Sequence, residues 1–223
     1  MLYSEALKND LYNYIINRPN ILEHEWSCYI FQIIAGLSIC QKYFNLYHND
    51  LHLSNIMYNY TKEKYIYYEY NNKIYRIKTY NKILKIIDWG RATYKFNNYE
   101  GKNNVYNSNG VAFGQYIFNR INNKGKKEIY SNPSTDLVIL GSNLIKQHLF
   151  PKKGNLSKLV KHWLKYKNSS INNIEEDTFS IYSIAAKFCE NAIPIKQIEN
   201  IVFNKFIINS SLIKSKDKKI YSI

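Results

Sequence analysis

Hydrophobic positions along residues 23–44 repeat with the period of an α-helix. The stripe, whose members are separated by four, three, four and three residues, consists of Trp26, Ile30, Ile33, Leu37 and Cys40. We expect a helix from about Glu23 to Phe44 that runs through the middle of a core. A shorter helix, from about Leu7 to Ile16, is expected before it, because Arg18-Pro19-Asn20 would end it.

The pattern after residue 55 predicts strands. A short apolar run, Ile56-Met57-Tyr58, follows a polar and irregular stretch. Two segments rich in Tyr and Ile, Tyr65–Tyr70 and Ile74–Thr79, meet at Asn71-Asn72, and asparagine tolerates left-handed turn geometry. We therefore expect a β-hairpin, followed by a further strand over Ile83–Ile87.

The second half of the chain has weaker patterns. Residues 95–133 are rich in Asn, Lys and Gly without periodicity, and we expect a long loop there. Ser134-Thr135-Asp136 has helix N-cap character and predicts a helix from Leu137 to about His148. The remainder is expected to be helical with polar breaks at 151–155, 168–173 and 191–194, and a frayed tail at 214–223.

Composition indicates a globular protein. The 223 residues are 45% hydrophobic and 22% charged, which is enough apolar material for a core and excludes a disordered chain. We expect a single domain over 1–223, of the α+β class and predominantly helical.

The net charge is +14, from 31 Lys and Arg against 17 Asp and Glu. Such an excess is typical of nucleic-acid-binding proteins. Only four of the 31 basic residues are arginines, the residue that reads phosphates and bases bidentately. Lys, Asn, Ile and Tyr are abundant and share A/T-rich codons, so base composition explains much of the charge. A nucleic-acid binder stays as a lesser alternative.

The cysteines and the apolar stretches exclude other classes. Cys28, Cys40 and Cys189 lack Cys-x-x-Cys spacing, which argues against a disulfide framework and a zinc site. The longest apolar stretch, Tyr29–Cys40, contains polar positions and is too short to cross a bilayer. Charged residues interrupt any apolar run at the start. We expect an intracellular protein without a membrane partner.

Two acidic motifs carry the candidate chemistry. The first is His48-Asn49-Asp50-Leu51-His52-Leu53-Ser54-Asn55, and the second is Ile86-Ile87-Asp88-Trp89-Gly90. Phosphoryl transfer needs a carboxylate that orients the attacking hydroxyl, and oxygen ligands that hold Mg²⁺ against the phosphates. An aspartate and an amide five residues apart can point into one cleft, and a second aspartate at a strand end can complete the metal site. Gly90 lets the chain leave the strand at an unusual angle.

These motifs resemble those of the protein kinase superfamily. His48–Asn55 is similar to the catalytic loop H-R-D-L-x-x-x-N, and Asp88-Trp89-Gly90 is similar to D-F-G. The resemblance implies that Asp50 is the catalytic aspartate and that Asn55 and Asp88 bind magnesium. It also implies that His48 is structural. Ser134–Leu137 resembles the start of a buried helix whose aspartate, here Asp136, braces the loop.

The resemblance also implies ligands and partners. ATP and Mg²⁺ would be the cofactors, Met57, Ile87 and Gly90 would contact the nucleotide, and a protein or small-molecule hydroxyl would be the acceptor. His52 could contact phosphate in catalysis or cap the loop. The composition and the Tyr-rich hairpin look like kinase-like proteins of giant DNA viruses, which would place the chain in host cytoplasm or the virion.

The departures from the kinase pattern are specific. The chain begins where a kinase hinge should lie, so the resemblance implies a C-terminal lobe without an N-terminal lobe, and a separate small-lobe polypeptide as a possible partner. Asp88 lies 38 residues after Asp50, and a hairpin insertion at 61–82 would account for the excess. Asn49 replaces the usual arginine, and no A-P-E motif follows.

The substrate class stays open at this stage. The form H-x-D-L-H-x-x-N is also similar to aminoglycoside and choline kinases, because His52 stands where Ser/Thr kinases commonly have lysine. We favour a Ser/Thr protein kinase over a small-molecule kinase. A non-catalytic pseudokinase or scaffold is the further alternative.

Overall fold

The computed structural model describes residues 9–18, 20–114, 119–121, 127–129, 131–166, 169–170, 178–213 and 219–223. Among these described residues helices make up 43% and strands 23%, so the fold is mixed α/β and the prediction of a predominantly helical protein is wrong. Short strands of two to four residues account for the difference, because such segments carry too few alternations to be read from sequence.

The central helix is α2, Glu23–Phe44, as predicted. It is buried on most of its surface over its first two-thirds, and it ends at Asn45, whose φ of 42° is left-handed. The helix α1, Leu11–Ile16, is shorter than predicted because Asp10 has extended backbone and caps it, accepting the N–H of Asn13 at 2.7 Å. Residues 7 and 8, the first two of the predicted helix, lie outside the described residues.

A three-stranded sheet leads to the candidate site. Its order is β1 (Asn9–Asp10), β2 (Ile56–Tyr60) and β5 (Lys82–Ile86), all antiparallel. Ile56 pairs with Ile86, so the residues just before β2 and just after β5 meet at one end of the sheet.

The predicted hairpin is confirmed as β3 (Tyr65–Tyr70) and β4 (Lys73–Lys78). Asn71 and Asn72 both have positive φ, 49° and 58°, as the turn requires. The hairpin packs on α2, where the ring of Phe31 contacts those of Tyr68 and Tyr75.

Two strands from the C-terminal part flank this hairpin. They are β12 (Ile207–Ile208) beside β4 and β13 (Ile220–Ser222), parallel to β3. The prediction of a frayed tail at 214–223 is therefore wrong for its end, where Ile223 is buried and its carbonyl accepts the Lys42 ammonium at 2.9 Å. Residues 214–218 lie outside the described part.

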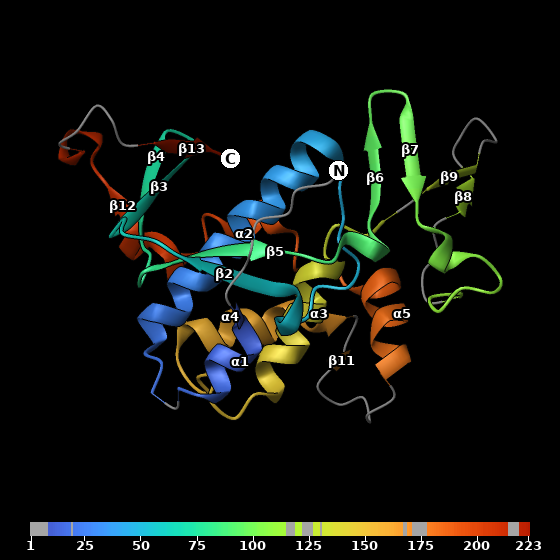
Figure 1. The fold of residues 1–223 in the computed structure, drawn as a ribbon, viewed down its shortest axis with the longest axis horizontal. Helices are drawn as coiled ribbons and strands as arrows, with labels where there is room; N and C mark the ends of the chain where they lie inside the picture. The colour runs from blue at the N-terminus through green and yellow to red at the C-terminus, as the bar shows by residue number, and fades with distance from the viewer. Residues whose placement is uncertain are drawn as a thin grey trace.

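The prediction of a long loop over 95–133 is wrong for the segments of this range that form strands. Two hairpins occupy much of it: β6 (Thr93–Phe96) with β7 (Tyr99–Lys102), and β8 (Asn119–Ile121) with β9 (Lys127–Ile129). The turn of the first contains Asn97 at a φ of 54°. Figure 1 shows the β6–β7 hairpin extending away from the helices.

The C-terminal half supplies further helices, the first two of which lie below the β2–β5 strands in Figure 1. They are α3 (Thr135–Lys146), α4 (Asn155–Trp163), α5 (Thr178–Phe188) and α6 (Pro194–Gln197), with the short pair β10 (Lys165–Tyr166) and β11 (Ser169–Ser170) between α4 and α5. The breaks predicted at 151–155 and 191–194 separate these helices as expected. Most of the break at 168–173 lies outside the described residues.

Within the described residues, α2, α3, α4 and both larger sheets contribute to one large hydrophobic core. In this described part of the chain nothing divides the fold into two lobes, and the prediction of a C-terminal lobe lacking its N-terminal lobe is wrong. No helix in the described ranges has the length and apolar character that a membrane span requires.

Candidate active site

Asp136 holds the polar loop that precedes β2. It lies in the first turn of α3, is 1% exposed, and accepts the backbone N–H groups of His48 at 3.1 Å and Asn49 at 2.7 Å. Burial raises the pKa of the Asp136 carboxyl, while the two backbone N–H donors act in the opposite direction. These two bonds connect the first turn of α3 to the backbone of the loop.

The ring of His48 connects this loop to the second motif. Its Nε2 lies 2.7 Å from the Ile87 carbonyl oxygen, and its Nδ1 lies 3.2 Å from the Asp50 backbone nitrogen. These partners assign a neutral imidazole that donates from Nε2 and accepts at Nδ1. The ring also lies 4.9 Å from that of Trp89. Because Ile87 and Trp89 flank Asp88, His48 fixes the Asp88 turn beside the loop.

Asp50 lies at the centre of the site, with its side chain 15% exposed. Its Oδ1 accepts the hydroxyl of Tyr182, from α5, at 2.6 Å. Its Oδ2 lies 3.4 Å from the Arg91 Nε. Burial, followed by this hydrogen bond, raises the pKa of Tyr182, so the phenol keeps its proton at neutral pH.

Asn55 is buried immediately before β2 and has hydrogen bonds to both motifs. Its Nδ2 donates to the Asp50 carbonyl at 2.9 Å, and its own carbonyl accepts the N–H of Ile87 at 3.0 Å. The amide oxygen Oδ1 is the atom that a metal ion would use. His52 is the N-cap residue of the 3₁₀ turn Leu53–Asn55, and its side chain makes no cap hydrogen bond there.

Asp88 is exposed and has a φ of 57°, in the left-handed region. Its Oδ1 accepts the N–H of Gly90 at 3.3 Å. A Cβ at Gly90 would come within 3.1 Å of the same oxygen, so a small residue suits the turn.

Asp88 and Asn55 are the predicted metal ligands, and two protein oxygen donors would need further oxygen ligands to complete a magnesium site. Among the residues that the structure describes, no group of three or more His, Cys, Asp or Glu side chains could hold a metal ion. Mg²⁺ in nucleotide enzymes uses one or two carboxylates together with phosphate and water oxygens. Asp88 and Asn55 supply such a partial set.

Met57 and Ile87, the predicted nucleotide contacts, are both half-buried. Along β2, Ile56 and Tyr58 are buried in the core, so Met57 belongs to the opposite face. Met57 pairs with Lys85, and Ile87 falls two residues further on, so both lie on the outer face of the sheet. That face ends at the Asp88 turn.

Sequence reasoning missed three residues of the site. Asn49, with a φ of 64°, donates from Nδ2 to the Arg91 carbonyl and the Thr93 hydroxyl, each at 3.0 Å. Arg91 and Tyr182 bind Asp50 directly. Arg91 could have been noticed, because it is one of four arginines and directly follows Gly90. Tyr182 is one of 22 tyrosines and carries no local signal.

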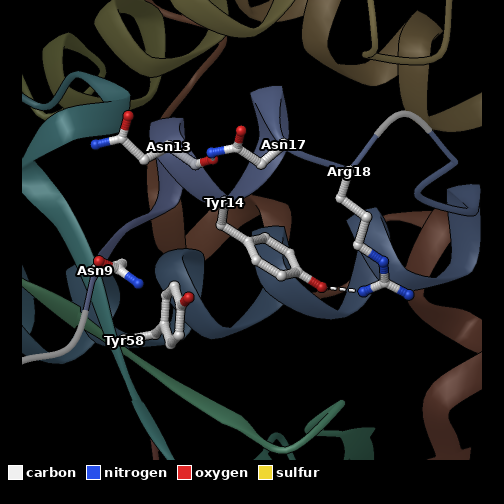
Figure 2. Close-up of a pocket in the computed structure, with 6 residues that line it drawn as sticks. All are labelled: Asn9, Asn13, Tyr14, Asn17, Arg18 and Tyr58. Atoms are coloured by element: carbon white, nitrogen blue, oxygen red, sulfur yellow. Dashed lines mark hydrogen bonds between the residues drawn. The ribbon is translucent and has the colours of Figure 1, made fainter.

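A separate pocket of about 450 Å³ lies beside α1 and contains none of the predicted site residues. Figure 2 shows the Arg18 guanidinium bonded to the Tyr14 hydroxyl along one side. The remaining lining residues are Asn9, Asn13, Asn17 and Tyr58. Both Arg18 and Tyr14 also bind the buried carboxylate of Glu25, at 2.7 and 3.0 Å, which explains their positions structurally.

A scan against protein-family models found no family that matches the chain, and a search of curated proteins found no relative. The assignment of a function therefore depends on the geometry of the site.

Proposed function

We propose that the chain is an ATP- and Mg²⁺-dependent phosphotransferase of the protein kinase type. The observation that carries this proposal is a set of three hydrogen bonds, two accepted by the Asp136 carboxylate and one made by the His48 ring. Asp136 holds the backbone of the Asp50 loop, and the His48 ring holds the Asp88 turn against it. A catalytic carboxylate and a metal-binding carboxylate are thereby kept on adjoining, fixed segments, as phosphoryl transfer requires.

Each residue has a distinct role in this proposal. Asp50 orients the acceptor hydroxyl and takes its proton. Asn55 and Asp88 would hold Mg²⁺, which when bound neutralises charge on the phosphates. Met57 and Ile87 offer an apolar surface to the base, Gly90 keeps the turn beside the nucleotide compact, and His52 contacts phosphate.

The acceptor that we propose is a serine or threonine hydroxyl of a protein, rather than a small molecule. Asp50 is only 15% exposed, so an acceptor must present its hydroxyl on an extended segment or a slender group. An intracellular location, where ATP is abundant, belongs to the same proposal.

A non-catalytic pseudokinase is the second candidate, and one observation favours it. Both carboxylate oxygens of Asp50 already have partners, Tyr182 and Arg91. In a pseudokinase this arrangement would be permanent, and the motifs would serve only binding or scaffolding.

The test is phosphate transfer by the purified chain with Mg²⁺ and γ-labelled ATP, offered casein as a Ser/Thr acceptor and an aminoglycoside as a small-molecule acceptor. The Asp50→Ala variant should lose at least about a hundredfold in rate, the lower range for a positioned general base. Glu63→Gln removes a charge from an exposed position and serves as the matched control. Equal transfer by wild type and Asp50→Ala would refute the role of Asp50, and nucleotide binding without any transfer would favour the pseudokinase.

A further inference from the structure

Tyr182 stands where the acceptor of the proposed reaction should stand. A general base must lie about 2.6–3.2 Å from the oxygen whose proton it takes. The Tyr182 hydroxyl oxygen lies 2.6 Å from Asp50 Oδ1 and donates to it. The chain thus supplies a protonated hydroxyl to its own candidate base.

The surroundings hold Tyr182 in this position. Ile181 and Ala185 anchor α5 in the core, and the Asn132 side chain donates to the carbonyls of Ala185 at 3.0 Å and Cys189 at 2.7 Å near the end of the helix. These contacts orient the helix face that carries Tyr182 toward the loop.

Arg91 is the second group that faces both partners. Its Nε lies 3.4 Å from Asp50 Oδ2, and its guanidinium carbon lies 5.6 Å from the centroid of the Tyr182 ring. A phosphate on the Tyr182 oxygen would therefore have a guanidinium close by, and Arg is the side chain best suited to bind phosphate.

We propose that Tyr182 is the first phosphate acceptor of this chain, so that the protein phosphorylates itself at Tyr182. The inference rests on the proposed function and on ATP as co-substrate. The Tyr182 oxygen attacks the γ-phosphorus, and the bond from that phosphorus to the β,γ-bridging oxygen breaks. ADP leaves with the electron pair, and the hydroxyl proton passes to Asp50.

The modification changes the site for later acceptors. Phosphotyrosine has no hydroxyl proton to donate to Asp50, and its negative charge is repelled by that carboxylate and attracted by Arg91. The Asp50 carboxylate is then open to a hydroxyl from another molecule. Transfer to an external acceptor should accordingly show a lag that ends as Tyr182 becomes phosphorylated.

The test uses the full chain with Mg²⁺ and γ-labelled ATP, and maps the phosphate by mass spectrometry against time. We expect Tyr182 to be labelled first, at a rate per molecule that does not change over a tenfold range of protein concentration. Tyr182→Phe should abolish this label and remove the lag with casein. Tyr166→Phe is the matched control, because Tyr166 stacks on Phe188 at the other end of α5. This substitution should leave the label on Tyr182 and the lag with casein unchanged.

Three results would overturn the inference. Transfer to casein without label on Tyr182 would refute it and leave the proposed function standing. Label on Tyr182 at a rate proportional to protein concentration would show transfer between molecules rather than within one. Absence of transfer to any acceptor, with Tyr182→Phe equally inactive and all variants folded by circular dichroism, would refute both the inference and the proposed function.

Discussion

At the scale of single residues, the Asp136 carboxylate takes the place of water as the hydrogen-bond acceptor for two buried backbone N–H groups. The two bonds, 3.1 Å to His48 and 2.7 Å to Asn49, offset the cost of burying its carboxylate. Because Asn49 has a left-handed φ of 64°, the loop backbone there needs such fixed partners to persist.

Asp136→Ala should destabilise the protein strongly. The substitution leaves both N–H groups buried without this acceptor, at about 1–3 kcal/mol each. We expect the free energy of unfolding, measured by urea titration, to fall by about 2–6 kcal/mol. Glu63→Gln, exposed and outside the site, should change it by less than about 0.5 kcal/mol. A loss for Asp136→Ala no larger than that of the control would contradict the bracing role.

The candidate site residues of the two motifs could be predicted from the sequence. In the structure, His48, Asp50 and Asn55 lie beside the Asp88 turn. These residues are close in sequence to a strand end, so local pattern locates them. Tyr182 could not be predicted, because it reaches Asp50 from 132 residues further along the chain. Which tyrosine contacts Asp50 depends on how α5 packs against the loop, and the local sequence does not indicate this packing.

At the scale of elements, the β3–β4 hairpin shows when turn chemistry suffices for prediction. Two positive-φ residues join strands of six residues each, and asparagine is among the few residues that accept this backbone. The opposite case is β6–β9, where the strands have three or four residues. Their pairing depends on contacts between chain segments rather than on local alternation.

Substitution of Asn72 should separate backbone strain from side-chain contacts in this turn. At a φ of 58°, alanine has the steric cost of a Cβ but no side-chain amide that could hydrogen-bond the local backbone. We therefore expect Asn72→Ala to lower the free energy of unfolding by about 1–2 kcal/mol. Asn72→Gly should change the stability by less than about half of that, because glycine adopts positive φ without strain. Equal losses in thermal or urea unfolding would show that φ does not limit the turn.

At the scale of the whole molecule, chain segments far apart in sequence complete the same sheet. The last strand, β13, pairs with β3, and Ile223 donates to the Glu69 carbonyl at 3.0 Å. This closure was not predicted, because a Lys- and Ser-rich tail gives no local sign of pairing. The central helix was predictable, because its period extends over 22 residues.

The core should make stability fall at high pH. Burial raises the pKa of the Cys28 and Cys189 thiols to about 12 from an ordinary value of 9.0. Between pH 9 and 12 the unfolded chain loses these protons while the folded chain keeps them, so rising pH favours unfolding. Each thiol should lower the free energy of unfolding by about 1 kcal/mol between pH 8 and pH 10.

Urea titrations at the two pH values measure this effect. The Cys28→Ala/Cys189→Ala variant is less stable at both values but should lose less between them than the wild-type chain. An identical loss in both proteins would show that the two thiols do not carry the pH dependence.

The central claim is that the Asp50 loop and the Asp88 turn form a site for Mg²⁺ and nucleotide. Thermal unfolding with millimolar Mg·ATP tests it independently of Tyr182 and of any acceptor. At about ten times the dissociation constant, binding adds about 1.4 kcal/mol, or roughly 3–6 °C for a chain of this length. Asp88→Asn should lose most of this shift, and Glu63→Gln should keep it. An unchanged midpoint in wild type, or an equal shift in Asp88→Asn, would contradict the account.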